Sequence, residues 1–546
     1  MHVPAAMPGA RSDEARGARG RVGALADPFH LGVAAITGAV AAFLLLRLHA
    51  WPPHEDEAVA YFISREPFAD LFRTVLGQRG GAPLHFILTH LVELVWPGLS
   101  GIRAISVAFA VGSVPLMAAL VARLADRRTA LLATALAAPS WILLFHGIYG
   151  RMYSLFLFTA TLSFVALERA LERPSKRRWL AWSLAMYACL ATQPYGAFVA
   201  GAQVVYVLAR WRRERLRLLP PLIAFGAVGV AALPLAKTYL HLASRYEVGV
   251  GGGGTKLNSP FAILEYLRRV VADFTTGYLV FFVVVVVLAA IGLIVLARTR
   301  PTSAVVAGAV FLVPAAGLSL MRLGAMSFPE SRHLIFALPF LVMLVATGFL
   351  RVVDRVGPVG RAVIPLAVGV LMAAEVAWGW QTTPALYVGE PQKRIDARHA
   401  AAAWLARTGR PNDVLFGFDP LFMEASQAGG SVGKLVVPRA DPKLAVDLLL
   451  AAPRPLGRGV WVHDASDTGN LSPRLTIPNR SPGAAFETHV FGPFLIVRTK
   501  QPIRTVPEFF RDTIKVERVG QALLIGDADV NYQTGVLALA RLGVRR

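Results

Sequence analysis

Three consecutive acids, Glu55, Asp56 and Glu57, follow the first long apolar segment of the chain. Acids are scarce, with 34 Asp and Glu against 56 Lys and Arg in 546 residues, and charge near a bilayer is costly unless it has a use. Asp56 or Glu57 would suit a general base that takes a proton from a hydroxyl, or an oxygen ligand of a divalent cation. The acids would equally suit the first turn of a helix beginning near Ala58.

Two further segments combine arginine with aromatic residues. Arg151 is followed by Tyr153, and Arg332 is followed by His333. Each guanidinium could bind a phosphate through charge-assisted hydrogen bonds, and the ring beside it could position that phosphate. The structural alternatives are a snorkelling arginine with an interfacial tyrosine, and a neutral histidine hydrogen-bonded inside a helix bundle.

The elements that carry these residues are apolar segments of membrane-spanning length. The chain is 55% hydrophobic and 16% charged, and one span takes about 20 helical residues. We therefore predict an α-helical polytopic membrane protein with about eleven transmembrane helices. The predicted spans lie near 31–48, 103–123, 129–146, 152–168, 179–193, 196–210, 218–239, 277–297, 303–320, 333–350 and 362–379.

Basic residues gather in short loops between the apolar segments, which favours a cytoplasmic location for those loops. The N-terminus is then cytoplasmic and the C-terminus extracytoplasmic, and the acids, Arg151 and Arg332 all fall on the outer side. The formal charge of +22 thus needs no nucleic-acid partner, because no base-reading or basic–aromatic motif accompanies it. The single cysteine, Cys189, excludes disulfides within the chain and cysteine-based metal sites.

The chain divides into three predicted parts. Residues 1–28 are a disordered cytoplasmic arm, 29–380 a transmembrane domain, and 381–546 a small soluble α/β domain outside the membrane. The last part shows short apolar strands beginning near Asp413, Gly433 and Gly459, with helical patterns at 396–408 and 442–451. Adjacent His463 and Asp464 should point to opposite faces of a strand, which favours a structural role for the pair.

The first outer loop, roughly 49–102, is too long for a simple turn. It holds the acids and the apolar segment Pro83–Trp96, which is shorter than a usual span. We expect this segment to form an interfacial or re-entrant helix, with interfacial helices elsewhere in the loop.

In their order along the chain, these motifs resemble the C-type superfamily of membrane glycosyltransferases. That superfamily uses polyprenyl-phosphate-linked sugars and includes protein O-mannosyltransferases and lipid A aminoarabinose transferases. The similarity covers roughly residues 30–350. The matching elements are Asp56-Glu57, the Pro-Leu-aromatic segment at 83–86, which contains His85, the stretch from Gly98 to Arg103, Arg151 to Leu155, and Arg332 to Pro339.

The chain departs from the family pattern at three places. No second acid stands between His146 and Tyr153, which weakens the expectation of a tightly bound metal. His333 replaces the usual tyrosine. Thr192 to Tyr195 stands where many relatives carry a histidine.

The resemblance implies a glycosyltransferase, hexosyl- or pentosyl-, that moves one sugar from a polyprenyl-phosphate donor to an acceptor hydroxyl. Asp56 would be the general base of an inverting reaction, with Glu57 orienting it or holding a cation. Arg151 and Arg332 would stabilise the leaving phosphate. The substrate-binding residues are then Arg151, Tyr153, Arg332, His333 and His85.

The resemblance also implies the partners. They are the donor, the lipid bilayer, and an envelope glycan, lipid or protein as acceptor; the metal ligands stay unknown, and a divalent cation such as Mg²⁺ or Mn²⁺ stays open. Two other classes compete with the enzyme. One is a transporter or flippase for envelope precursors, which predicts inverted repeats and broken helices. The other is a membrane scaffold for envelope assembly.

Overall fold

The structure is a computed structural model of the whole chain. It describes residues 27–77, 83–236, 238, 259–274, 282–322, 330–381, 392–439, 442–465, 475–523 and 540–541. Apart from its last two residues, the predicted N-terminal arm lies outside this part of the chain.

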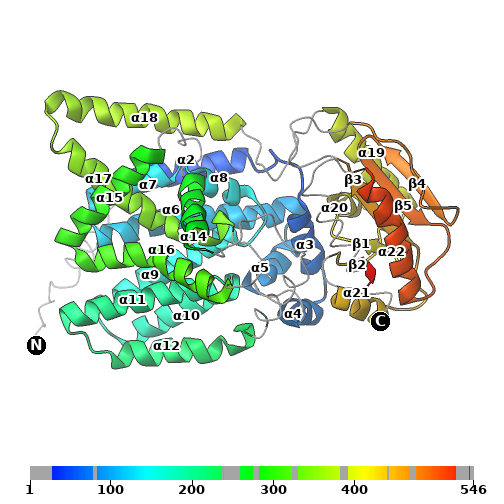
Figure 1. Cartoon of the computed structure of the whole chain (residues 1–546), viewed down its shortest axis with the longest axis horizontal. Coiled ribbons are helices and arrows are strands. Elements are labelled where there is room, and N and C mark those ends of the chain that lie inside the picture. Colours follow the sequence, from blue (N-terminus) through cyan, green and yellow to red (C-terminus); the bar gives the residue numbers. More distant parts are fainter. Residues whose placement is uncertain are drawn as a thin grey trace, which may run out of the picture.

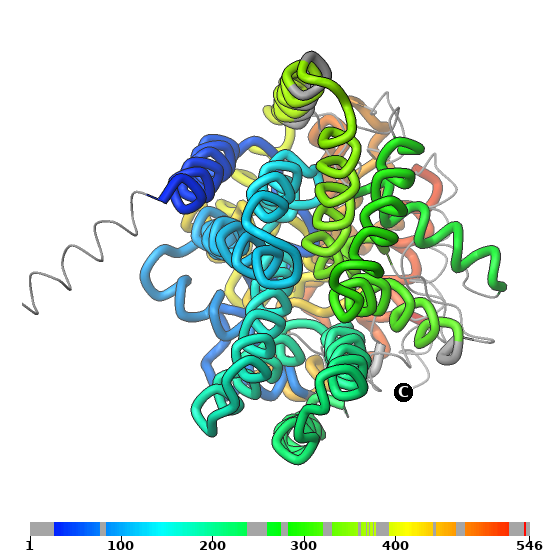
Figure 2. Tube along the Cα trace, turned by 90° about the vertical axis from the view of Figure 1, so that its left-hand side faces the viewer, coloured from blue at the N-terminus to red at the C-terminus, as the bar shows by residue number. Residues whose placement is uncertain are grey.

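A bundle of helices forms one end of the molecule, and a small α/β domain forms the other (Figure 1). Seen from the bundle end, the helices lie in front of that domain (Figure 2). The helices of the bundle are α2 (Pro28–Leu46), α6 (Leu99–Leu124), α7 (Arg127–Ala137), α8 (Trp141–Ile148), α9 (Tyr153–Glu172), α10 (Lys176–Thr192), α11 (Gly196–Glu214), α12 (Leu219–Ala231), α14 (Pro260–Phe274), α15 (Phe282–Thr299), α16 (Pro301–Arg322), η3 (Ser331–Ala337), α17 (Leu338–Val353) and α18 (Pro358–Gln381).

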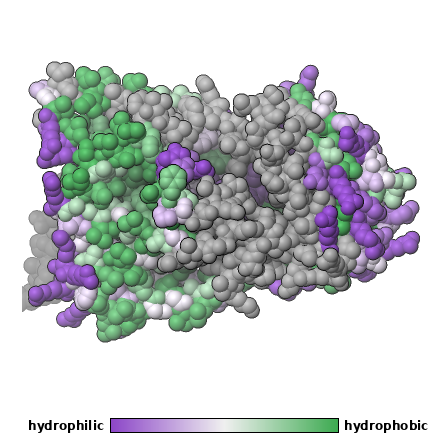
Figure 3. Space-filling view, viewed as in Figure 1, coloured by the Kyte–Doolittle hydropathy of each residue, from purple (hydrophilic) through white to green (hydrophobic). Residues whose placement is uncertain are grey.

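The bundle carries an apolar outer surface. Within the described ranges, six helices are long and apolar enough to cross a membrane, or seven if the bent pair α7–α8 is one span. Large apolar side chains such as Leu222, Ile223, Val283 and Leu312 are well exposed, which suits lipid rather than water. Figure 3 shows this apolar surface over the bundle, with hydrophilic residues at both ends of the molecule. The chain is thus a multi-pass membrane protein, and the total of about eleven spans stays a prediction.

The predicted span at 129–146 is bent rather than straight. Helices α7 and α8 meet at 61° around Pro139, which cannot donate a backbone hydrogen bond to the preceding turn. Ser140 Oγ donates to the carbonyl of Phe274, at 2.7 Å, and so ties the bend to α14. The bend sets the direction of α8, which leads directly into the Arg151 segment.

The segment predicted as the first outer loop contains three short helices, α3 (Glu55–Ser64), α4 (Phe68–Gly77) and α5 (Pro83–Glu93). Helix α3 begins with a capping box. The backbone N–H of His54 donates to Glu57 Oε2 at 3.1 Å, and the N–H of Asp56 donates to His54 Nδ1 at 3.1 Å. The acids therefore do occupy the first turn of a helix, as one of the sequence interpretations held.

The C-terminal domain is an α/β fold. Its elements are α19 (Gln392–Thr408), β1 (Val414–Phe416), α20 (Pro420–Gln427), β2 (Leu435–Val437), α21 (Pro442–Ala451), β3 (Gly459–Asp464), β4 (Phe486–Phe491), β5 (Phe494–Thr499) and α22 (Val506–Gln521). The strand order is β2-β1-β3-β5-β4. The first three strands are parallel; β5 pairs antiparallel with β3, and β4 pairs antiparallel with β5. The first three strands and the helices at 392–408 and 442–451 match the sequence prediction.

Alternate residues of the sheet pack on its two faces. Leu415 and Val462 belong to an apolar core that includes Tyr61 of α3 and residues of α19 and α20. Trp461 and Leu495 belong to a second core, with residues of α21 and α22. One face of the sheet is therefore turned toward α3, which lies between the bundle and this domain (Figure 1).

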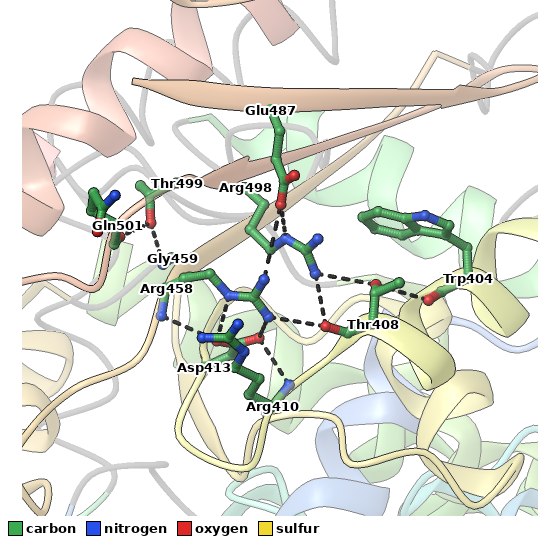
Figure 4. A network of polar contacts seen from close by, with 10 residues as sticks. All are labelled: Trp404, Thr408, Arg410, Asp413, Arg458, Gly459, Glu487, Arg498, Thr499 and Gln501. Atoms are coloured by element: carbon green, nitrogen blue, oxygen red, sulfur yellow. Dashed lines mark hydrogen bonds and ion pairs between the residues drawn. The ribbon is translucent and has the colours of Figure 1, made fainter. Parts of the chain in front are cut away.

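A polar network closes the amino ends of β1 and β3 (Figure 4). The buried carboxylate of Asp413 accepts from Arg458 Nε at 3.1 Å and Nη2 at 2.7 Å, and from the backbone N–H of Arg410 at 3.0 Å. Arg458 and Arg498 both donate to the carbonyl of Thr408, at 3.0 Å each. The network joins the end of α19 to the start of both strands, so this edge of the sheet is filled by its own side chains.

Candidate active site

Glu57 fixes the start of α3 against α6. Arg103 Nε donates to Glu57 Oε1 and Nη2 to Oε2, each at 2.8 Å. The same guanidinium donates to the carbonyls of Leu48, Trp51 and Pro52, at 2.9–3.1 Å. The chain between the first span and α3 is thus wrapped around Arg103.

Glu57 also holds the segment between α8 and α9. The N–H of Gly150 donates to Glu57 Oε1 at 2.8 Å, and Ser106 Oγ donates to the carbonyl of Tyr149 at 2.7 Å. A Cβ atom at Gly150 would lie 2.9 Å from Ile102 and 3.1 Å from Glu57 Oε1, so a side chain there would push this segment away from α3. These contacts bring the side chains of residues 149 and 151 to the first turn of α3.

Asp56 is the acid that faces these side chains. Tyr149 donates its hydroxyl to Asp56 Oδ2 at 2.8 Å, and Arg151 Nη2 lies 3.7 Å from Oδ1. The Asp56 side chain is 31% exposed, whereas that of Glu57 is fully buried. Burial acts to raise the pKa of Asp56, but the charges of Arg151, His54 and Arg332 and the Tyr149 hydrogen bond together hold that pKa well below its usual range. Asp56 is therefore an ionised, accessible carboxylate.

Aromatic rings support the second arginine. The guanidinium of Arg332 lies 5.1 Å from the ring centroid of Tyr153, and Nη2 pairs with Glu330 at 2.7 Å. His333 stacks on Tyr195, with ring centroids 4.7 Å apart and planes 12° apart. Tyr195 belongs to the segment that departs from the family pattern, and His333 departs from that pattern as well. Two of the places where this chain differs from the family therefore contact one another.

Both arginines keep an unused donor. Within the described residues, the Nε atoms of Arg151 and Arg332 are buried and have no hydrogen-bond partner. A buried donor without a partner costs about 1–3 kcal/mol, and more when it is charged. The charges of Arg151 and Arg332 both act on Asp56, so the two guanidinium groups lie near the same carboxylate. Such a pair is suited to an anion with several oxygen atoms, such as a phosphate.

His85 lies within electrostatic reach of Arg151. It is fully buried, and both ring nitrogens lack a hydrogen-bond partner among the described residues. Burial, followed by the charge of Arg151, lowers the pKa of His85 to about 3, so the imidazole is neutral. The predicted substrate-binding role of His85 requires a ligand that reaches this depth, and it stays a prediction.

The structure gathers the predicted residues at the end of the bundle that faces the C-terminal domain (Figure 1). Asp56, Arg151 and Arg332 act on one another, with Tyr153 and His333 beside Arg332. The carboxylate oxygens of Glu57 accept from protein donors, which favours the orienting role over the cation-holding role. Within the described ranges, no group of three or more His, Cys, Asp or Glu residues could hold a metal ion.

Sequence reasoning did not single out several neighbours of these residues. Tyr149 stood next to the Arg151 motif, and Arg103 ended one of the matching family elements, so a signal existed for both. Tyr195 appeared only as the end of a segment that departs from the family pattern. His146, whose ring centroid lies 4.7 Å from that of Tyr153, gave no comparable signal.

No protein-family model matches the sequence, and no curated protein matches it either. Solved structures do match the fold. ArnT from Cupriavidus metallidurans, bound to undecaprenyl phosphate, superposes with a TM-score of 0.56 at 13% identity, over 85% of this chain and 97% of that one. The archaeal oligosaccharyltransferase AglB from Archaeoglobus fulgidus, in complex with an inhibitory peptide and a dolichol-phosphate, superposes with a TM-score of 0.50 at 10% identity, over 80% and 70%. The chain therefore has the fold of the C-type membrane glycosyltransferases.

Proposed function

We propose that the protein transfers a single sugar from a polyprenyl-phosphate donor to an acceptor hydroxyl at the outer face of the cytoplasmic membrane. The observation that carries this proposal is the group formed by the Asp56 carboxylate and the two guanidinium groups with unused donors, Arg151 and Arg332. It rests also on the shared fold, because ArnT and AglB were solved with polyprenyl-type phosphates. The N-terminus is then cytoplasmic and the C-terminal domain extracytoplasmic.

Arg151 and Arg332 bind the donor phosphate and neutralise the charge that it gains as the bond to the sugar breaks. Donors placed in advance where charge develops stabilise the transition state more than the ground state. Tyr153 packs against Arg332 and limits its movement. The glycosyl group develops positive charge at the anomeric carbon, as in other glycosyl transfers.

Asp56 accepts the proton of the attacking hydroxyl from the face opposite the phosphate, which gives inversion. In the unliganded protein its low pKa makes it a weak base. The negative charge of a bound donor phosphate opposes the field of the two arginines and so raises the pKa of Asp56. Donor binding thereby strengthens the base at the moment when it is needed, while Glu57 orients it through the first turn of α3.

The test is transfer of radiolabelled sugar from polyprenyl phosphate by the purified full-length protein, with washed membranes of the source cells as acceptor. Asp56→Asn should lower transfer at least 100-fold while donor binding, measured by filter binding, stays within about threefold. Asp70→Asn, an exposed acid on α4 of the same loop, is the matched control and should retain full activity. Parallel reactions with EDTA and with added Mg²⁺ or Mn²⁺ decide whether a cation takes part. Wild-type activity in Asp56→Asn would refute the assignment.

A further inference from the structure

The apolar surface of the bundle contains a groove between α2, the bent pair α7–α8 and α18, whose places are seen in Figure 1. The groove has a volume of about 250 Å³, and every side chain that lines it is apolar. Its lining includes Ala39 and Phe43 of α2, Pro139 and Leu144 at the bend, and Met372 and Val376 of α18. Because α7 and α8 bend around Pro139, the bend itself shapes one wall of the groove.

The groove extends over about the depth of one bilayer leaflet. Its lining residues on α2 run from Ile36 to Phe43, and Arg47 follows one turn later, as the residue that caps this candidate span. Ile36 and Arg47 are separated by about 16 Å along the helix axis, at 1.5 Å per residue. One leaflet supplies about half of a hydrocarbon core that is about 30 Å thick. The groove and Arg47 together therefore match the depth at which one leaflet holds an acyl chain and its headgroup.

Two tryptophans hold the side chain of Arg47 at one end of this groove. Residues four apart share a helix face, so Arg47 follows Phe43 on α2, and Trp380 follows Val376 on α18. The rings of Phe43 and Trp380 meet with their centroids 5.5 Å apart. The guanidinium of Arg47 lies 5.2 Å from the centroid of Trp380 and 5.9 Å from that of Trp51. A cation flanked by indole rings at the end of a span is typical of the headgroup level of a bilayer.

Arg47 keeps its hydrogen-bond donors for a ligand. Its side chain is half-buried, and its Nε is buried without a hydrogen-bond partner. Among the residues that the structure describes, no carboxylate pairs with Arg47. The two indole rings attract the positive charge, but they offer it no oxygen acceptor. The charge of Arg47 is therefore complementary to an anion that carries oxygen atoms.

Helix α8 separates the groove from the proposed active site. Leu144 lines the groove, whereas the ring of His146 lies 4.7 Å from that of Tyr153, beside Arg332. Two successive positions apart on an α-helix, side chains point about 200° away from one another. The groove and the proposed phosphate site thus lie against opposite faces of α8. This arrangement favours a second lipid in the groove over the tail of the sugar donor.

We propose that this groove binds one phospholipid of the bilayer, and that the lipid carries a net negative headgroup. An acyl chain lies along α2, between the α7–α8 bend and α18, and the phosphate oxygens accept hydrogen bonds from Arg47. A zwitterionic headgroup binds more weakly, because Arg47 repels its ammonium group. The bound lipid connects α18 to α2 and to the bend, so it stabilises the folded bundle. This site is independent of the transfer reaction and of Asp56.

Native mass spectrometry of the detergent-solubilised full-length protein can count the lipid that stays bound. The probes are phosphatidylglycerol and phosphatidylethanolamine with the same acyl chains. The wild type should retain one phosphatidylglycerol at least fivefold better than phosphatidylethanolamine. Arg47→Gln should reduce this preference to less than twofold. Ala39→Trp fills the groove from an exposed position on α2 and should lower the retention of both lipids at least tenfold. The matched controls, Arg298→Gln and Ala290→Trp, change exposed residues of α15 and should behave as the wild type does.

Differential scanning fluorimetry provides a second measurement, which also checks that each variant folds. Added phosphatidylglycerol should raise the apparent unfolding temperature of the wild type by several degrees, and that of Ala39→Trp by less than one degree. Equal retention and equal shifts in the wild type, Arg47→Gln and Ala39→Trp would refute the site. Undecaprenyl phosphate at equal concentration should not displace the phosphatidylglycerol. Displacement that depends on Arg47 would assign the groove to a polyprenyl lipid and overturn the proposal.

Discussion

Glu57 and Arg103 form a two-point ion pair from which solvent is excluded, with side chains 0% and 1% exposed. The pair joins the first turn of α3 to the first turns of α6, and its remaining donors hold three backbone carbonyls. Partial loss of such a pair leaves an uncompensated charge away from water, which costs about 3–5 kcal/mol. The buried Glu57 thus fixes the position of the adjacent Asp56, which is accessible to solvent.

Replacement of Arg103 by lysine should therefore disable the protein although the charge is kept. Lysine offers three donors from one atom, and it cannot reach both Glu57 oxygens and the three carbonyls at once. We expect Arg103→Lys to lose at least 90% of transfer activity and to lower the apparent unfolding temperature by several degrees. Arg123→Lys changes a half-exposed ion pair on the same helix and should alter neither quantity. Normal activity in Arg103→Lys would show that the position of α3 does not depend on the two-point pairing of Arg103 with Glu57.

Removal of the Tyr149 hydroxyl should change the pH dependence of transfer as well as its rate. Tyr149→Phe deletes one of the hydrogen bonds that hold the pKa of Asp56 low, so this pKa rises. We expect kcat to fall about 10–100-fold, the value of a lost hydrogen bond to a charged group, with the donor KM nearly unchanged. The acid limb of the kcat profile should move to higher pH. Tyr206→Phe on α11 is the control, and an unshifted acid limb in Tyr149→Phe would contradict the role given to this hydroxyl.

Arginine at position 332 should be needed for its shape. Arg332→Lys keeps the charge but loses the planar contact with Tyr153 and the buried Nε donor. We expect kcat to fall about 100-fold, in line with the loss of one preorganised donor to a developing anion, and the donor KM to rise less than tenfold. The measurement is steady-state transfer across a donor titration, with Arg269→Lys on the exposed face of α14 as control. A change in KM alone would mean that Arg332 binds the phosphate equally in ground and transition states.

The residues that sequence reasoning could place are those whose position follows from local rules. Local rules suffice for the apolar lengths of the spans, for the cap that begins α3, and for the placement of Asp56, Arg151 and Arg332 at one end of the bundle. The pairing of Glu57 with Arg103, 46 positions apart, does depend on such contacts, because only packing brings α6 beside α3.

Strands β4 and β5, which were not predicted from the sequence, show the same difference between local rules and distant contacts. Strand β4 lies at the edge of the sheet. Only Phe486 is buried in it, and its other residues, Glu487 included, are partly exposed, so the strand has no buried run. Strand β5 is buried throughout, including Arg498, whose charge hides the strand pattern in the sequence. Arg498 can be buried because it donates hydrogen bonds to Glu487 and to the carbonyl of Thr408. The sequence alone does not show these contacts.

Asp419 should make the stability of the protein depend on pH. Its pKa is raised to about 6 by burial, so its charged form is disfavoured in the folded state. The protonated carboxyl therefore contributes to the free energy of unfolding, and this contribution is fully present below the ordinary aspartate pKa of 3.8. It is lost as the pH rises through about 6, which lowers the free energy of unfolding by an amount on the order of 3 kcal/mol. Asp419→Asn keeps the cap on α20, where Asp419 accepts from the N–H of Leu421 at 2.9 Å, because asparagine caps helices as well as aspartate does.

The asparagine variant should therefore unfold at a higher apparent temperature than the wild type at pH 7.5 and at the same temperature at pH 4. Differential scanning fluorimetry of the detergent-solubilised full-length protein at both pH values provides the measurement. Asp126→Asn, which makes the same change at an exposed cap of α7, controls for altered cap chemistry. Asp419 faces Arg439, Asp464 and Glu55, so a stabilisation that persists at pH 4 would assign the effect to packing rather than to the charge of this carboxyl.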